Sequence, residues 1–259
     1  MIVNHTHKFI FLKPPKTAGS SVQVALRQFC GPDDTVSYLA DHNDNTDGKE
    51  RKGRGEGSFR RRGEGFRHIQ RYIGNFLVKS GHCTLPMIQL GDPEMYEHIM
   101  NNYTKISIVR NPWDAAVSRF YHIKAYYDRM NAGEELPTTN TLKARKNLPE
   151  PTRFSDYMRD HHDFLLHPKQ SFDRYYFVDG KMVMDFVLRY ENLESDYKYL
   201  CNKILKIRYN PLPRRLTKIR KDRSPYMRHF RGPTRKEMIR TIEKENERTI
   251  QHFGYKFGK

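Results

Sequence analysis

The chain has 259 residues and a formal net charge of +17 at pH 7, because 47 lysines and arginines stand against 30 aspartates and glutamates. This length predicts one large domain over residues 1–259, and a content of 15 Phe and 16 Tyr argues against a disordered chain. No run of about 18 apolar residues is present, which excludes a membrane-spanning helix.

A strand, a loop and a helix are predicted in succession near the start of the sequence. The apolar run from Lys8 to Lys13 is typical of a buried strand. A loop follows over residues 14–21, and the spacing of apolar residues over 22–29 then predicts a helix, which Gly31-Pro32 ends.

The same alternation of strands and helices is predicted along the rest of the chain. The segments are a polar, mobile loop at about 41–65, a possible strand at 76–78, a helix at 93–100, a strand at 105–109, a helix from Pro112 to about Tyr127, a loop at 131–152, helical segments at 154–167, a strand at 184–189, a helix at 191–207, an extended basic stretch at 208–231 and a helix at 234–253. Buried strands that alternate with helices predict an α/β fold, with a parallel sheet covered by helices on both faces.

The cysteines and the first apolar run bear on the compartment. The run at 9–12 is too short for the core of a signal peptide. Cys30, Cys83 and Cys201 are odd in number, widely spaced and in no metal-ligand pattern. We therefore expect a cytoplasmic protein with reduced thiols.

The loop after the first predicted strand has the composition of a phosphate-binding loop. A junction of strand and helix directs unpaired backbone N–H groups, and the positive end of the helix dipole, at whatever the loop holds. Gly19 allows a close backbone approach and Lys16 adds a positive charge, while Thr17, Ser20 and Ser21 supply hydroxyl donors. It is not a Walker A loop, in which the lysine follows the glycine. The alternative is an ordinary serine-capped helix with an exposed lysine.

A second junction of strand and helix follows at residues 106–121. Arg110 ends the strand, Pro112 suits the first turn of a helix, and Ser118 lies two turns into that helix. Arg110 and Ser118 can reach one anion only because the chain reverses direction between them. The alternative makes Arg110 a salt-bridging strand end and Ser118 an incidental helix serine.

The two junctions together resemble the two cofactor-binding signatures of sulfotransferases that use 3′-phosphoadenosine 5′-phosphosulfate (PAPS). The matching runs are Pro15-Lys16-Thr17-Ala18-Gly19-Ser20-Ser21 and Arg110-Asn111-Pro112 with Ser118-Arg119-Phe120-Tyr121. The likeness is closest to the carbohydrate branch, which includes heparan and chondroitin sulfotransferases and bacterial relatives. Shorter runs at 80–82, 186–193 and 253–257 agree in order, so the resemblance covers about residues 8–257. It implies a single sulfotransferase domain with a three-layer, P-loop-like fold, in which a central parallel sheet is flanked by helices.

The resemblance also implies how these residues bind the donor. The 5′-phosphosulfate would be held by Pro15, Lys16, Thr17, Ala18, Gly19, Ser20 and Ser21. Arg110 and Ser118 would bind the 3′-phosphate. Lys16 would also stabilise the charge that develops on the bridging oxygen as the product 3′,5′-bisphosphoadenosine (PAP) leaves.

A histidine between the two motifs is the candidate catalytic base. His82 stands where relatives place a catalytic histidine, and an imidazole suits removal of a proton from the acceptor hydroxyl near neutral pH. The alternative is a surface or packing histidine, and His122 is a weaker candidate for the base. Glu191 and Asp114 also lie near motif ends, where capping and salt bridges explain them.

Relatives carry a basic loop that closes over the 3′-phosphate, and Arg220, Lys221 and Ser224 lie at the equivalent place. The cytosolic branch has Arg-Lys-Gly there, whereas this chain has Asp222 in place of the glycine. The alternative is a solvated basic stretch.

The expected acceptor is a hydroxyl-bearing sugar or polar small molecule, whose site segments 31–75 and 128–180 would shape. No acidic strand end suited to Mg²⁺ is evident, so we expect a reaction without metal. Two other classes remain open. A P-loop-type kinase or other nucleotide-dependent enzyme is disfavoured by the order of lysine and glycine. A nucleic-acid-binding protein is suggested by the charge of +17, but no motif supports it.

Overall fold

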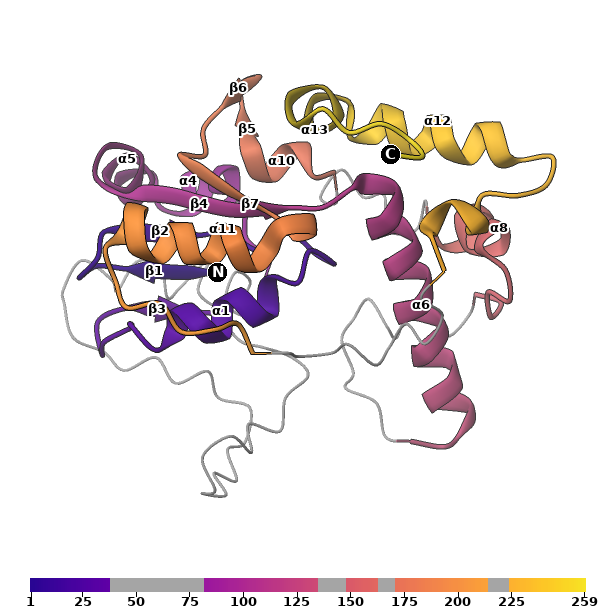
Figure 1. Ribbon diagram of the computed structural model, residues 1–259, viewed down its shortest axis with the longest axis horizontal. Coiled ribbons are helices and arrows are strands. Elements are labelled where there is room, and N and C mark those ends of the chain that lie inside the picture. Colours follow the sequence, from indigo (N-terminus) through magenta and orange to yellow (C-terminus); the bar gives the residue numbers. More distant parts are fainter. Residues whose placement is uncertain (38–81, 135–147, 163–170, 214–223) are drawn as a thin grey trace. The chain divides into compact units, whose positions relative to one another are not determined.

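The computed structural model describes residues 1–37, 82–134, 148–162, 171–213 and 224–259 (Figure 1). The chain divides into two compact units. Unit 1 consists of Met1–Ile108 and Val178–Pro213, and unit 2 of Val109–Phe177 and Arg214–Lys259. The polar loop at 41–65 and the strand at 76–78 that the sequence predicts lie outside the described residues.

Unit 1 contains a five-stranded sheet with the strand order β3-β1-β2-β4-β7. The strands are β1 (Ile2–Asn4), β2 (Phe9–Phe11), β3 (Thr35–Val36), β4 (Thr104–Val109) and β7 (Phe186–Arg189). The three strands predicted at 8–13, 105–109 and 184–189 are thereby confirmed as β2, β4 and β7. Every residue of β2 is buried, as expected for a strand that is covered on both faces.

The sheet is mixed, which corrects the prediction of a parallel sheet. The predicted parallel pairing is present between β2 and β4. However, β1 runs antiparallel to both β2 and β3. The link from β1 to β2 consists only of residues 5–8, whereas parallel neighbours need a crossover of about a dozen residues. β1 escapes prediction because Ile2-Val3 is too short to show a period.

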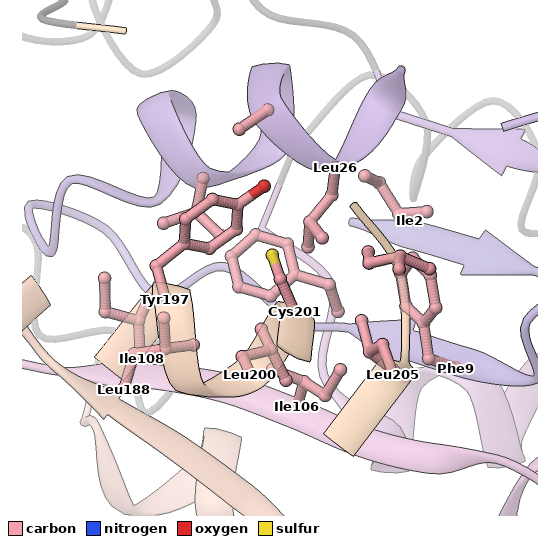
Figure 2. Close-up of a cluster of buried hydrophobic side chains, with 14 residues drawn as sticks. Ile2, Phe9, Leu26, Ile106, Ile108, Leu188, Tyr197, Leu200, Cys201 and Leu205 are labelled. Carbon is pink, nitrogen blue, oxygen red and sulfur yellow. The ribbon is translucent and has the colours of Figure 1, made fainter. Parts of the chain in front are cut away.

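One face of the sheet packs against α1 (Gly19–Arg27) and α11 (Leu193–Tyr199). Figure 2 shows side chains from α1, the strands and the segment after β7 gathered into one cluster. The fully buried members of this cluster are Ile2, Phe9, Phe11, Val22, Ala25, Leu26, Ile106, Ile108, Leu188, Tyr197, Leu200 and Cys201. Residues two apart in β2 and in β4 share this face because side chains alternate along a strand.

The described part of unit 1 contains further elements. They are α4 (Leu85–Gly91), α5 (Pro93–Asn102), β6 (Lys181–Met182), the 3₁₀ turn η4 (Tyr190–Asn192) and the π-helix η5 (Leu200–Leu205). β6 forms a two-stranded sheet with β5 (Phe177–Val178). The helix predicted at 93–100 is confirmed as α5, whose first turn is capped by Asp92, since Asp92 Oδ1 accepts from Met95 N at 2.8 Å. The helix predicted at 191–207 is present as three successive segments, η4, α11 and η5.

Unit 2 is helical. Its elements are α6 (Pro112–Asn131), α8 (Phe154–Tyr157), the π-helix η2 (Met158–His162), α10 (Asp173–Tyr176), the 3₁₀ turn η6 (Tyr226–His229), α12 (Arg235–Glu245) and α13 (Glu247–Phe253). The core consists largely of aromatic and aliphatic residues of α6, α8 and α12, among them Trp113, Phe120 and Tyr157. The predicted helix from Pro112 is confirmed. The segment at 154–167 is helical as far as residue 162, beyond which eight residues lie outside the described part.

The last predicted helix, at 234–253, is wrong in one respect, since it consists of two helices. Asn246 separates α12 from α13 with φ −123° and ψ 30°. Its side chain accepts from Phe172 N at 3.1 Å and donates to Ile242 O at 3.0 Å. This tertiary contact outweighs the helical propensity of the surrounding sequence.

Candidate active site

The loop between β2 and α1 has an unusual backbone at two positions. Lys16 and Ala18 adopt φ angles of +64° and +63°, in the left-handed region that residues other than glycine rarely occupy. Each such residue costs about 1 kcal/mol or more. Thr17 between them is fully buried, and its hydroxyl donates to Pro14 O at 2.8 Å. The backbone conformation of the loop is therefore set by contacts within the protein. The one hydroxyl proton of Thr17 is used in a hydrogen bond inside the loop.

The helix after this loop begins without a side-chain cap. The N-cap residue is Ala18, and no acidic residue stands in the first turn. The alternative of a serine-capped helix with an exposed lysine is therefore wrong, since Lys16 is also half-buried. Ser21 N binds Ala18 O at 3.0 Å. The uncapped first turn retains the positive end of the helix dipole, which is the feature that suits an anion.

Gly19 is required by a close contact inside the protein. A Cβ atom at this position would lie 2.1 Å from Cγ and 2.9 Å from Cδ of Lys13. Lys13 is only 5% exposed. The close neighbour of Gly19 within the protein is thus the side chain of Lys13, a residue that the motif alone does not single out.

His82 lies beside the same loop. Its Nδ1 is 2.8 Å from Lys13 O, and the ring is half-buried. A carbonyl oxygen only accepts, so Nδ1 carries the hydrogen. In the neutral ring the other nitrogen, Nε2, is then unprotonated and able to take a proton. Of the residues predicted for the site, the run from Pro15 to Ser21 and His82 are brought together in unit 1.

The start of the loop is tied to β4 through Leu12. Leu12 N donates to Ile106 O at 2.8 Å, and the hydroxyl of the fully buried Ser107 donates to Leu12 O at 3.0 Å. Both backbone polar groups of Leu12 are thus satisfied by the neighbouring strand. This anchors the point from which the loop and Lys13 leave the sheet.

The thiol next to His82 is chemically inert at neutral pH. Cys83 is fully buried, and burial raises the pKa of its thiol to about 12. The nucleophilic and basic form of a cysteine is the thiolate, which is then absent near pH 7. Cys83 is therefore a packing residue beside the candidate base.

The second motif forms the beginning of α6 in unit 2. The side chain of Asn111 accepts from the backbone N–H groups of Trp113 and Asp114, at 3.1 and 3.2 Å, and so caps the helix. Pro112 is the first helical residue, as predicted. The sequence Asn-Pro thereby terminates the strand segment and starts the helix within two residues.

Arg110 forms an ion pair with Asp114. Its Nε and Nη2 groups lie 2.9 and 2.7 Å from Asp114 Oδ2, and Arg110 is 7% exposed. The salt-bridging role considered for both residues is confirmed. The ion pair also holds the guanidinium over the first turn of α6. Ser118, which is half-buried, lies one turn beyond Asp114 on the same helix face, because residues four apart are neighbours.

The segment that contains Ser224 is connected to the same helix end. The hydroxyl of Tyr226, two residues further on, lies 3.4 Å from Asn111 Nδ2 and accepts from Gly258 N at 2.8 Å. Unit 2 therefore brings Arg110, Ser118 and the Ser224 segment to one end of α6. Arg220 and Lys221 lie outside the described residues, so their predicted role stays a prediction, as does the meeting of this group with the loop of unit 1.

Other features of the described part do not locate the site. A hollow of about 380 Å³ in unit 2 is lined by Trp113 and by residues of α12, α13 and the C-terminal segment, but by none of the predicted site residues. No three His, Cys, Asp or Glu side chains within the described ranges are placed to share a metal ion. Nor does any helix in those ranges have the length and apolar character needed to cross a membrane.

Comparison with known proteins gives one match. The family model described as "Sulfotransferase family" matches residues 1–256, almost the entire chain. No match was found among curated proteins or among solved structures.

Proposed function

The chain belongs to the sulfotransferase family, and on that premise we propose that it transfers the sulfuryl group of PAPS to a hydroxyl of a carbohydrate or a polar small molecule. Sulfuryl transfer and a transferase activity of the EC 2.8.2 type follow from the family. We propose in addition the identity of the donor and the acceptor and the residues that act on them. A P-loop-like fold and a cytoplasmic location are also proposals.

The donor supplies an activated sulfuryl group, whose bond to the 5′-phosphate oxygen breaks as a bond to the acceptor oxygen forms. Such in-line transfer depends on positioning and on neutralisation of charge more than on covalent catalysis. The loop 14–21 is suited to the first task, because its strained backbone and internal hydrogen bond fix its path. The uncapped first turn of α1, with Lys16, Ser20 and Ser21, would hold the 5′-phosphosulfate.

His82 would take the proton of the acceptor hydroxyl. The observation that carries this assignment is the contact of Nδ1 with Lys13 O at 2.8 Å, which leaves Nε2 as the basic nitrogen of a ring beside the loop. Lys16 would stabilise the negative charge on the departing 5′-phosphate oxygen. Loss of one such contact typically costs about 3–4 kcal/mol of barrier, or about 10²–10³ in rate.

Recognition of the 3′-phosphate is assigned to the end of α6. Arg110 supplies a charged, bidentate-capable guanidinium held by Asp114, and Ser118 supplies a hydroxyl on the same face. Ser224, Arg220 and Lys221 would contribute from the basic segment. The residues proposed for the 5′-phosphosulfate belong to unit 1, and those proposed for the 3′-phosphate belong to unit 2. The proposal requires that both groups bind the same donor molecule.

A calorimetric titration tests the proposal. We expect PAP to bind at micromolar level without a metal ion, and ATP to bind much more weakly because it lacks the 3′-phosphate. Equal affinity for both nucleotides, or a requirement for Mg²⁺, would favour a P-loop-type kinase instead. Radiolabelled donor assayed over a panel of glycans and small alcohols would then identify the acceptor class.

A further inference from the structure

Tyr226 links the two segments of unit 2 to which recognition of the 3′-phosphate is assigned. Its hydroxyl lies 3.4 Å from Nδ2 of Asn111, the residue that follows Arg110. The amide oxygen of Asn111 accepts from two backbone N–H groups of the first turn of α6, so the amide is held with its nitrogen towards Tyr226. In the other direction along the chain, only Pro225 separates Tyr226 from Ser224.

The connection between Tyr226 and Ser224 is short and stiff. Pro225 has φ −52° and ψ 137°, and the proline ring fixes the first of these angles. Two residues of a chain span at most about 7 Å. Arg228 N donates to Pro225 O at 3.0 Å, which closes the turn η6 directly behind the proline. A displacement of Tyr226 therefore displaces Ser224 as well.

The ring of Tyr226 is packed against the segment that follows α13. It meets Phe257 edge to face, with 5.7 Å between the ring centroids. Phe257 meets Trp113 of α6 and Phe230 in the same manner, at 5.6 and 5.1 Å. Trp113 and Phe230 are only 1% and 2% exposed. The ring of Tyr226 thus belongs to an aromatic cluster that includes the beginning of α6.

The hydroxyl of Tyr226 is not needed for this packing, since a phenylalanine ring would fill the same space. What the hydroxyl adds is acceptance from two N–H groups that are distant in the sequence, Gly258 N at 2.8 Å and Asn111 Nδ2 at 3.4 Å. The shorter contact fixes the hydroxyl, and the longer one is at the outer limit of a hydrogen bond. The hydroxyl thus serves the placement of the Ser224 segment at the end of α6.

On the basis of the proposed function, we propose that Tyr226 is a positioning residue for the 3′-phosphate, which holds Ser224 beside the end of α6 where Arg110 lies. Groups that are already in place lose less conformational entropy when a ligand binds, which strengthens binding. The residues proposed for the 5′-phosphosulfate belong to unit 1, so this effect concerns the 3′-phosphate alone.

The test removes the hydroxyl and keeps the ring, in Tyr226→Phe. We expect the affinity for PAP to fall by about threefold to tenfold, the effect of one neutral hydrogen bond. The affinity for adenosine 5′-phosphate, which lacks the 3′-phosphate, should change by less than about twofold. In a Ser224→Ala background, Tyr226→Phe should have little further effect, because the side chain that it positions is absent. All affinities are measured by calorimetric titration.

Two further variants separate positioning from stability. Tyr127→Phe is the matched control, because it removes a hydroxyl that donates to Leu148 O at 2.9 Å near the other end of α6. It should leave the preference for PAP over adenosine 5′-phosphate unchanged, whatever its effect on the melting temperature. Phe257→Leu keeps the hydroxyl of Tyr226 but removes the ring that supports it, and should lower the preference in the same direction as Tyr226→Phe.

Each outcome has a distinct meaning. If the wild-type protein binds PAP no better than adenosine 5′-phosphate, the proposed function itself fails. If the wild type prefers PAP and Tyr226→Phe keeps the full preference, only the role of Tyr226 is overturned. Equal losses of both affinities in Tyr226→Phe, additive effects of Tyr226→Phe and Ser224→Ala, or failure of Tyr226→Phe to fold would show that the hydroxyl is structural and would also overturn the role.

Discussion

The carbonyl of Lys13 determines which nitrogen of His82 can act as a base. A backbone oxygen has no hydrogen to donate, so it selects the tautomer in which Nδ1 carries the proton. Because the acceptor belongs to the main chain next to an anchored strand end, it cannot swing away with a rotamer change. A backbone group at the end of a strand thus helps to orient the imidazole.

Replacement of His82 by alanine tests its role as the base. We expect turnover to fall by about 10²–10⁴, the usual contribution of a general base, while PAP binding stays within about twofold of wild type. The two quantities are measured by radiolabelled-donor assay and by calorimetry. His98→Ala, at an exposed histidine of the same unit, is the control and retains full turnover. Substantial activity of the His82 variant would place the base elsewhere.

The ion pair with Asp114 orients the guanidinium group of Arg110 and neutralises part of its positive charge. Asp114 contacts Nε and Nη2 and so fixes the plane of the guanidinium, while its negative charge opposes the binding of an anion. A rigid arginine loses less conformational entropy when a phosphate binds, which favours the 3′-phosphate role despite the neighbouring carboxylate.

Arg110→Ala is therefore expected to abolish the preference for PAP over adenosine 5′-phosphate. The affinity for PAP should fall by about ten- to a hundredfold, whereas the affinity for adenosine 5′-phosphate should change little, because only the first nucleotide carries the 3′-phosphate. Both are measured by calorimetric titration. Arg129→Ala, at an exposed arginine near the other end of α6, serves as control. A preference that survives in Arg110→Ala would contradict the assignment.

At the scale of elements, junctions between strand and helix carry the candidate site. Each is stabilised by side chains that meet backbone groups: Thr17 closes the first loop, Asn111 caps α6, and Ser107 holds the strand end. These local bonds fix the loops in advance of any ligand. The left-handed backbone at Lys16 and Ala18 costs conformational free energy, which the surrounding packing offsets.

A side chain also caps backbone N–H groups at the start of α13, and its contribution can be measured as a change in protein stability. The Asp173 carboxylate accepts from the backbone N–H groups of Arg248 and Thr249 and from the Thr249 hydroxyl, at 3.2, 2.8 and 2.6 Å. Asp173→Ala removes this cap and should cost about 1–2 kcal/mol, seen as a lower melting temperature. Asp173→Asn keeps an acceptor and should lose less, and Asp128→Ala at an exposed position should lose almost nothing. Equal melting of Asp173→Ala and wild type would contradict the capping role.

At the scale of the whole molecule, buried thiols make stability depend on alkaline pH. Burial raises the pKa of Cys83 to about 12 and that of Cys30 to about 11, from a value of 9.0 in an exposed thiol. The folded protein therefore keeps protons that the unfolded chain releases. This stabilisation is complete below pH 9 and is lost as the pH rises from 9 towards 12.

We expect the free energy of unfolding to fall in this range by up to about 1.4 kcal/mol per pH unit for Cys83 alone. Denaturant unfolding under reducing conditions, between pH 8 and 11, measures the slope. In Cys83→Ala the slope should be smaller by that amount. An identical slope in both proteins would mean that the Cys83 thiol is not shielded from ionisation.

The sequence by itself determined the two signature loops, the strands β2, β4 and β7, the helices α5 and α6, and the family. These features depend on local patterns: apolar runs, a proline at a helix start, and a glycine among hydroxyl residues. The salt bridge of Arg110, which the sequence offered only as the alternative to phosphate binding, is present as an ion pair with Asp114.

Tertiary structure alone decided the remaining features. The pairing of β1 with β3, the break at Asn246 and the contact of Lys13 with His82 all depend on partners distant in sequence. These partners are β3, Phe172 and, 69 positions along the chain from Lys13, His82. From the sequence, a lysine directly after a strand is expected to be solvated. In the structure, the alkyl chain of Lys13 packs against Gly19 at the start of α1 and is buried. Contacts of this kind leave no periodic signal, because the energy that fixes them arises from packing and burial rather than from local propensity.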